Sequence, residues 1–255
     1  MQLPVNAFKQ AILADQPQIG LWCSLSSYQV VELVARSQFD WLLLDMEHAP
    51  NDISTLHTQL MATEGTKSHP VVRPPWNDML WIKRCLDIGA QSLLLPYVQN
   101  AEEAANAVAW SRFPKGGMRG VASGTRAGGF GRIKDFLHSV QEQTCVLVQL
   151  ESMEAIRNVD AICALDGVDG VFIGPSDLSA DMNHLGDIQH PEVQETIAAA
   201  IRRIRANGKA AGILTTEAQG QQYIDMGARF VAVGTDMTLL RLATDALAAR
   251  FKQPQ

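Results

Sequence analysis

Eight short apolar runs, spaced along the chain and separated by segments long enough for helices, constrain the fold of this sequence most strongly. Runs that are apolar at nearly every position are typical of strands buried on both faces of a parallel sheet. They cover residues 19–24, 41–45, 70–73, 92–96, 146–151, 170–174, 210–214 and 230–234. Eight strand–helix units within 255 residues indicate an α/β fold of the (β/α)8 TIM barrel type.

The segments between the runs support the same fold. Residues 191–207 have apolar side chains at helical spacing, with proline at the first position and glycine directly after the last. Residues 87–96 and 225–234 repeat one pattern, a helix end followed by a glycine and a strand. A doubly wound sheet fits less well, because no Gly-x-Gly-x-x-Gly motif follows the first run. We expect one domain over residues 1–255.

Charge and composition exclude several classes of protein. The 21 Lys and Arg residues are outnumbered by 27 Asp and Glu residues, so the net charge of −6 argues against a nucleic-acid partner. No apolar stretch approaches the roughly 18 residues of a membrane span, and the first residues do not resemble a signal peptide. We therefore expect a cytoplasmic protein with no membrane partner. The four widely spaced cysteines are expected to be buried, reduced thiols.

Polar residues gather at the carboxyl ends of the runs, where a barrel of this type places its active site. Glu151 and Asp177 end adjacent units, 26 positions apart, so both carboxylates are able to reach one ion. Two protein oxygens, with the remaining positions left to water and substrate, suit Mg²⁺ or Mn²⁺. Two solvated loop acids, or the acid and base of a glycosidase, are the alternatives.

Further side chains at this end of the runs are suited to acid–base chemistry and anion binding. Asp45 precedes His48 by three residues and is placed to orient its imidazole as a general base. Arg73 precedes two prolines and suits a carboxylate, an enolate oxygen or a salt bridge. The N–H groups of Ser176 and Asp177 open a helix and are able to bind a small carboxylate. The other histidines are expected at the surface, namely His57, His69, His138, His184 and His190.

Seven stretches of the sequence are similar to one known family and follow the family's order along nearly the whole chain. They are residues 18–22, 39–45, 47–51, 71–74, 145–149, 167–175 and 177–182. With these stretches the sequence resembles the HpcH/HpaI class II pyruvate aldolases, and within them the 4-hydroxy-2-oxoheptane-1,7-dioate aldolases of aromatic catabolism. The resemblance implies reversible cleavage of a 4-hydroxy-2-oxo acid to an aldehyde and pyruvate or a related 2-oxo acid. It also implies that the cofactor is a divalent metal ion, either Mg²⁺, Mn²⁺ or Co²⁺.

Carried over by position, the resemblance assigns residues to the metal and to the 2-oxo acid. It implies that Glu151 and Asp177 bind the metal. It further implies that Arg73 and Gln149 contact pyruvate or its enolate, while the backbone N–H groups of Ser176 and Asp177 bind the pyruvate carboxylate.

The resemblance also implies that His48, with its paired aspartate, takes part in proton transfer, and that Leu214 belongs to the substrate-binding residues. Two departures from close relatives concern the aldehyde. Met46 stands in place of a glycine and is expected to add bulk beside the base. The loop of residues 123–131 differs as well, and within it Arg126 is expected to face the acceptor.

The family's usual assembly implies a homohexamer in which the terminal helix, residues 238–251, packs on a neighbouring barrel. Two other interpretations stay open. A metal-dependent lyase of the citrate-lyase-beta type, acting on a CoA thioester, would need a basic patch, and only the scattered Arg112, Lys115 and Arg119 are available. A non-catalytic barrel that binds a 2-oxo acid as a sensor would not need a base, metal ligands and an arginine together.

Overall fold

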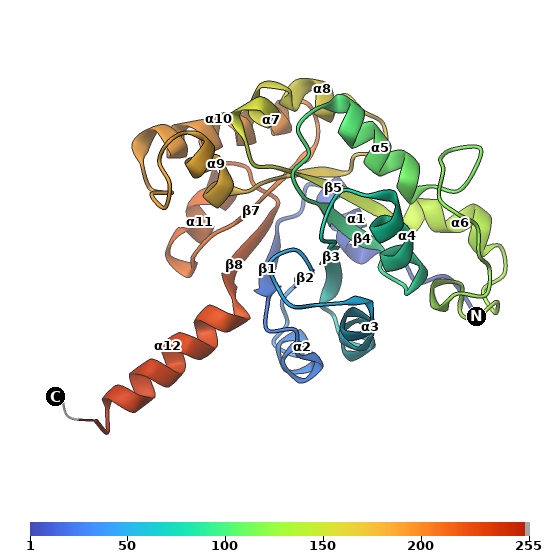
Figure 1. Ribbon diagram of the computed structural model, residues 1–255, viewed down its shortest axis with the longest axis horizontal. Helices are drawn as coiled ribbons and strands as arrows, with labels where there is room; N and C mark the ends of the chain where they lie inside the picture. The colour runs from blue at the N-terminus through green and yellow to red at the C-terminus, as the bar shows by residue number, and fades with distance from the viewer. Residues whose placement is uncertain (253–255) are drawn as a thin grey trace.

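The computed structural model describes residues 1–252 and contains a closed barrel of eight parallel strands (Figure 1). Each strand pairs with the next in sequence, and β8 pairs with β1 to close the sheet. The strands are β1 Gln18–Cys23, β2 Trp41–Asp45, β3 His69–Arg73, β4 Ser92–Leu95, β5 Cys145–Leu150, β6 Gly170–Ile173, β7 Ala210–Leu214 and β8 Phe230–Thr235. The predicted barrel is confirmed, and each predicted strand matches the observed one to within one residue at either end.

Helices fill the connections and surround the strands in Figure 1. The predicted helix 191–207 is observed as α10, and the longest connection, between β4 and β5, contains α5, the 3-10 turn η1 and α6. The helices are α1 Ala7–Leu13, α2 Tyr28–Ala35, α3 Ile53–Ala62, α4 Met79–Asp87, α5 Ala101–Ser111, η1 Arg126–Gly128, α6 Phe136–Gln143, α7 Met153–Arg157, α8 Val159–Cys163, α9 Pro175–Asp181, α10 Pro191–Ala206, α11 Glu217–Asp225 and α12 Asp236–Ala249. All four cysteines are buried and free, as predicted.

Side chains alternate between the barrel interior and the layer under the helices, as the two-residue repeat of a strand requires. Large rings fill the amino end of the interior, where Trp41 and Phe230 begin their strands and are fully buried. Gly20 and Gly212 make room for these rings, because a Cβ atom on either glycine would lie 2.2 Å from the facing ring. Aromatic rings therefore fill the amino half of the barrel interior.

Helix α1 covers the amino end of the barrel and has no counterpart among the predicted helices. Its Phe8 contacts the rings of Trp41 and Phe230, with centroids 5.8 and 6.0 Å apart. Phe8 also stacks on His69 at 5.7 Å, and Nε2 of His69 lies 2.8 Å from Oγ of Ser92. The expected surface position of His69 is therefore wrong, because β3 begins beneath α1. Burial lowers the pKa of His69 to about 4.

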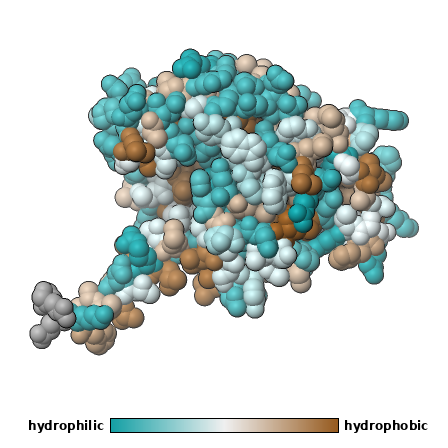
Figure 2. Space-filling model, viewed as in Figure 1, coloured by the Kyte–Doolittle hydropathy of each residue, from teal (hydrophilic) through white to brown (hydrophobic). Residues whose placement is uncertain are grey.

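Helix α12 leaves the barrel after β8 and extends away from it (Figure 1). Asp236 anchors its first turn by accepting the backbone N–H groups of Ser24 and Leu25 at 2.9 and 3.2 Å. Figure 2 shows hydrophobic side chains along the helix, and four of its leucines are more than half exposed, namely Leu239, Leu240, Leu242 and Leu247. The predicted terminal helix is thus present, and little of this chain covers it. Within residues 1–252, none of the helices has the length and apolarity needed to cross a membrane.

Candidate active site

The carboxyl ends of β2, β3 and β5 bring polar side chains into one region. Asp45 and Arg73 are register partners on neighbouring strands, Gln149 lies near the end of β5, and Glu151 follows that strand. In each of these strands, the residue two positions before the polar one belongs to the core inside the barrel. Because side chains of a strand alternate between its two faces, Asp45, Arg73 and Gln149 also point inward. We call this region the mouth and define it by Asp45, Glu47, Arg73, Gln149 and Glu151.

A guanidinium and two carboxylates form one side of the mouth. Nε and Nη2 of Arg73 donate to the two carboxylate oxygens of Asp45 at 2.9 and 2.7 Å, in a bidentate arrangement. Nη1 of Arg73 lies 2.7 Å from Oε2 of Glu47. The indole of Trp22 supports both partners, because its N–H donates to Asp45 at 3.1 Å and its ring lies 4.7 Å from Cζ of Arg73. The arginine is therefore held in one orientation.

Glu151 forms the other side of the mouth. Its Oε2 accepts the backbone N–H of Tyr97 at 3.0 Å, and its Oε1 accepts the side-chain amide of Gln149. Gly174 makes room for this carboxylate, since a Cβ atom there would lie 2.5 Å from Oε1 of Glu151. Oε1 of Gln149 is buried without a hydrogen-bond partner among the described residues. Such a buried acceptor indicates that a ligand or an ion completes the site.

The carboxyl groups of the mouth influence one another and the nearby Asp177. Burial, followed by the charges of Glu47 and Asp177, raises the pKa of Glu151 to about 7. Burial also raises the pKa of Glu47, against the opposing charge of Arg73. Asp45 differs: burial alone would raise its pKa, but the hydrogen bonds and charge of Arg73, with the hydrogen bonds from Trp22 and the backbone of Glu47, together hold this pKa below the usual value. Arg73 thus offsets only part of the combined effect of burial and mutual repulsion on Glu47 and Glu151.

The donor atoms around Glu151 fit a hard divalent cation. Glu151 and Asp177 supply carboxylate oxygens whose charges interact, and Gln149 supplies an unpaired side-chain oxygen. Oxygen donors of this kind suit Mg²⁺ or Mn²⁺, and a bound cation would offset the repulsion that raises the pKa of Glu151. The two residues predicted as metal ligands are brought to the same end of the barrel.

His48 lies at the rim of the mouth with an exposed side chain. The structure does not show the predicted pairing of its imidazole with Asp45. Oδ1 of Asp45 accepts the backbone N–H groups of Glu47 and His48 at 3.0 and 3.4 Å, while Arg73 and Trp22 use the remaining capacity of the carboxylate. The charge of His48 instead acts on Glu47.

The other predicted substrate contacts lie on β7 and α9. Ser176 and Asp177 are exposed in the first turn of α9, where backbone N–H groups have no partner within the helix. Leu214 ends β7 and is partly buried against the inner core. These three residues therefore lie at the same end of the barrel as the mouth.

Two predictions about the acceptor side are wrong. The side chain of Met46 is buried under the helices, with its Sδ 3.9 Å from Sγ of Cys85, so it adds no bulk beside His48. Arg126 lies at the amino end of the barrel, where Nη1 donates to the carbonyl of Ile88 at 2.6 Å and Nη2 pairs with Glu64. There it lines a cavity of about 760 Å³ instead of the mouth.

Glu47 was not predicted as a site residue, although it contacts Arg73 and its charge acts on Glu151. The sequence contains a signal for it. Asp45 and Glu47 are two positions apart, so a strand continued past Asp45 would direct both side chains inward, although β2 ends at Asp45.

Comparisons with known proteins show the family to which this chain belongs. The model of the family described as HpcH/HpaI aldolase/citrate lyase matches residues 18–243. A 4-hydroxy-2-oxo-heptane-1,7-dioate aldolase of Salmonella dublin is 56% identical over 248 residues, which cover 96% of this chain and 94% of the relative. Among solved structures, a family protein from Burkholderia cenocepacia J2315 is 40% identical, with a TM-score of 0.93 over 97% of this chain and 100% of its own. An HpcH/HpaI aldolase from Desulfitobacterium hafniense DCB-2 is 26% identical, with a TM-score of 0.89 over 97% of each chain. The chain described here belongs to the HpcH/HpaI aldolase/citrate lyase family.

Proposed function

We propose that this chain is a divalent-metal-dependent class II aldolase that reversibly cleaves 4-hydroxy-2-oxo acids to pyruvate, or a related 2-oxo acid, and an aldehyde. The observation that carries the proposal is the position of Arg73, fixed by two carboxylates, in the same mouth as Glu151 and Gln149. Because the relative from Salmonella dublin is named for 4-hydroxy-2-oxo-heptane-1,7-dioate, that dioate is the first substrate to test. Its cleavage would give pyruvate and a four-carbon aldehyde that retains the second carboxylate.

The 2-oxo acid portion of the substrate is proposed to bind between Arg73 and the first turn of α9. The N–H groups of Arg73 that Asp45 and Glu47 leave free would donate to the C2 oxygen. Backbone N–H groups of Ser176 and Asp177 would receive the C1 carboxylate. A divalent metal held by Glu151 and Asp177 would supply Lewis-acid stabilisation of negative charge on the C2 oxygen.

Cleavage requires one proton to leave oxygen and one to arrive at carbon. A base removes the proton of the C4 hydroxyl, the C3–C4 bond breaks as the C4 aldehyde forms, and the electron pair of that bond passes to the C2 oxygen as an enolate. Protonation at C3 then gives pyruvate. We assign the base to His48, because an imidazole at the rim is able to exchange protons with both the hydroxyl and solvent. Arg73 would hold the enolate oxygen throughout.

Exchange of pyruvate methyl protons with D₂O, followed by NMR, tests the enolate chemistry without any knowledge of the aldehyde. We expect exchange with Mg²⁺ or Mn²⁺, loss of exchange after exhaustive chelation, and recovery when the metal is added back. Undiminished exchange after chelation would contradict the metal-dependent mechanism. Retro-aldol cleavage of the dioate, assayed by pyruvate formation, then tests the substrate.

Two variants separate the roles of the base and the arginine. His48→Ala is expected to slow exchange by roughly 10²-fold or more, the usual contribution of a general base. Arg73→Lys is expected to reduce both exchange and cleavage, because an ammonium cannot reproduce the bidentate pairing with Asp45. His138→Ala, on an exposed position of α6, is the control. Wild-type exchange in His48→Ala would assign the base elsewhere.

The CoA-thioester alternative is less well supported, because one of its three candidate basic residues is buried in an ion pair. Arg119 is 1% exposed, pairs with Asp87 at 2.7 Å and lies over the ring of Phe113. It is therefore not available to CoA phosphates. Methyl-proton exchange also discriminates against a non-catalytic sensor, since a sensor would bind the 2-oxo acid without exchanging its protons.

We also propose that the chain assembles as a homohexamer in which α12 is exchanged onto a neighbouring barrel. The exposed leucines of α12 support this proposal, because a helix with so much apolar surface needs a partner. Residues 1–255 are proposed to act as one domain in this assembly, and residues 253–255 lie outside the described part of the chain.

A further inference from the structure

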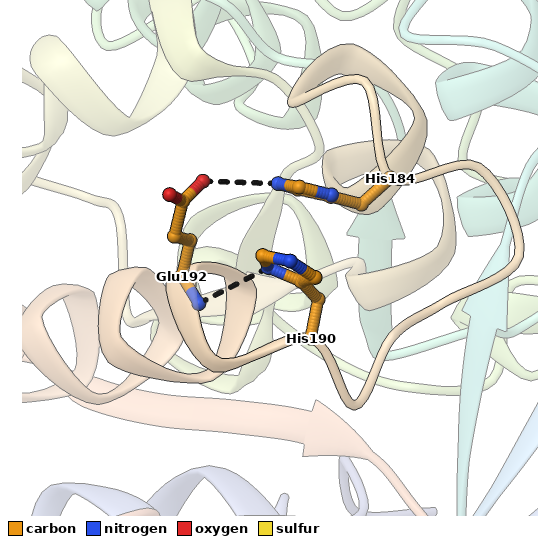
Figure 3. A group of neighbouring side chains, drawn as sticks. All are labelled: His184, His190 and Glu192. Atoms are coloured by element: carbon orange, nitrogen blue, oxygen red, sulfur yellow. Dashed lines mark hydrogen bonds and ion pairs between the residues drawn. The ribbon is translucent and has the colours of Figure 1, made fainter.

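Two histidines on the segment that joins α9 to α10 meet a glutamate in the first turn of α10 (Figure 3). Donor atoms from His184, His190 and Glu192 all lie within 4.8 Å of one another, and Nε2 of His184 is 3.0 Å from Oε2 of Glu192. We propose that these three residues bind a transition-metal ion of the Zn²⁺, Ni²⁺ or Cu²⁺ class, at a site separate from the mouth.

The donor chemistry of this cluster differs from that of the mouth. Two imidazole nitrogens and one carboxylate oxygen suit Zn²⁺, Ni²⁺ and Cu²⁺, whereas carboxylate and amide oxygens suit Mg²⁺ and Mn²⁺. Glu192 would also supply a negative charge to offset that of the ion. The two sites are therefore expected to select different cations from a mixture.

Backbone hydrogen bonds hold the segment in a compact shape. The N–H of His184 donates to the carbonyl of Ser179 at 2.7 Å, and the N–H of Asp187 donates back to the carbonyl of His184 at 2.9 Å. The N–H of His190 donates in turn to the carbonyl of Asp187 at 3.1 Å. Because the backbone is fixed in this way, only side-chain movement is needed to assemble the ligands.

Side-chain rotation is needed to bring the three donor atoms onto one ion. The imidazole rings stack with centroids 3.5 Å apart and 16° between their planes, so an ion in the plane of one ring lies outside the plane of the other. Nδ1 of His190 accepts the N–H of Glu192 at 3.3 Å, which fixes that ring and leaves its Nε2 for a metal. His184 is only partly buried and Glu192 is exposed, so both are able to rotate toward the spacing of about 3.4 Å that tetrahedral zinc ligands require.

Copper titration of the full-length protein, followed by electron paramagnetic resonance, tests the site. Excess Mg²⁺ is present so that the mouth is saturated. The wild-type protein is expected to bind one Cu²⁺ per chain, with hyperfine coupling from imidazole nitrogens. His184→Gln and Glu192→Gln are each expected to weaken this binding at least 10-fold, while His138→Gln, which changes an exposed histidine on α6, leaves it unchanged.

The proposal would be overturned if His184→Gln and Glu192→Gln both kept the wild-type affinity, or if the wild-type spectrum lacked nitrogen coupling. Thermal unfolding of each variant without metal checks that the fold is intact. The result is independent of the aldolase proposal, since methyl-proton exchange with Mg²⁺ alone measures the mouth. If the protein exchanges pyruvate methyl protons but binds no copper, only the metal-site proposal fails. If it binds copper but does not exchange these protons, only the aldolase proposal fails.

Discussion

Gly174 is the residue on which the position of Glu151 depends most directly. A Cβ atom at Gly174 would lie 2.5 Å from Oε1 and 2.7 Å from Cγ of Glu151, so Gly174→Ala must displace this carboxylate. Second-sphere changes at metal sites usually cost 10- to 100-fold in affinity. We therefore expect Gly174→Ala to weaken Mn²⁺ binding at least 10-fold by calorimetry, with a comparable loss in kcat/KM.

A matched control exists in Gly124, where an added Cβ atom would meet nothing within 4 Å. Gly124→Ala is expected to bind Mn²⁺ as the wild type does. Equal affinities in the two alanine variants would show that Glu151 does not hold the metal.

Strand alternation determines how much of the mouth is predictable from sequence. It directs Asp45 and Arg73 inward, and their pairing follows from the register of neighbouring strands. Extended past the end of β2, the same rule would direct Glu47 inward and Met46 outward, which is where these side chains lie. The partners of His48 could not be predicted in this way, because the backbone turn after β2 presents the N–H of this residue, rather than its ring, to Asp45.

Among the elements, α12 carries the strongest expectation about assembly. A charge placed within its exposed leucines should prevent apolar contact with a second copy of the chain, because burying an unpaired carboxylate is costly. Leu240→Glu is expected to lower the molar mass measured by light scattering on a sizing column. Arg241→Glu adds negative charge beside Asp245, on the polar stripe of the same helix, and is expected to keep the assembly. An unchanged mass for Leu240→Glu would contradict the proposed exchange.

The strands and most helices are predictable because each contains its own signal, an apolar run or a helical repeat with a stop. Helix α1 is different, since its place is fixed by contacts of Phe8 with Trp41 and Phe230, which are distant in sequence. The position of Arg126 likewise depends on Ile88 and Glu64, at the ends of other units. Neither set of contacts leaves a local pattern in the chain.

For the molecule as a whole, the partly buried His69 beneath α1 predicts acid sensitivity. Its pKa is about 4 in the folded protein and about 6.5 in an unfolded chain, so the unfolded state binds more protons between these values. Stability is therefore expected to fall as the pH drops from about 7 to 4, by up to about 3 kcal/mol from this group.

Urea unfolding at pH 7 and at pH 4.5 measures this effect. In the His69→Gln variant the glutamine side chain does not titrate but can still form a hydrogen bond with Ser92. The free energy of unfolding of this variant should therefore fall less between pH 7 and pH 4.5 than that of the wild type. Equal losses in the two proteins would show that His69 does not contribute.

The ring-filled amino end of the barrel has a kinetic consequence. Because α1 and the rings beneath it pack together at that end, both cleavage products of the proposed reaction are expected to depart through the mouth. With Arg73 5% exposed and His48 at the rim, the proposed roles of these residues would place the 2-oxo acid deeper than the aldehyde. Release is therefore expected to be ordered, with the aldehyde first. Pyruvate should then inhibit competitively against the hydroxy acid, and the aldehyde noncompetitively.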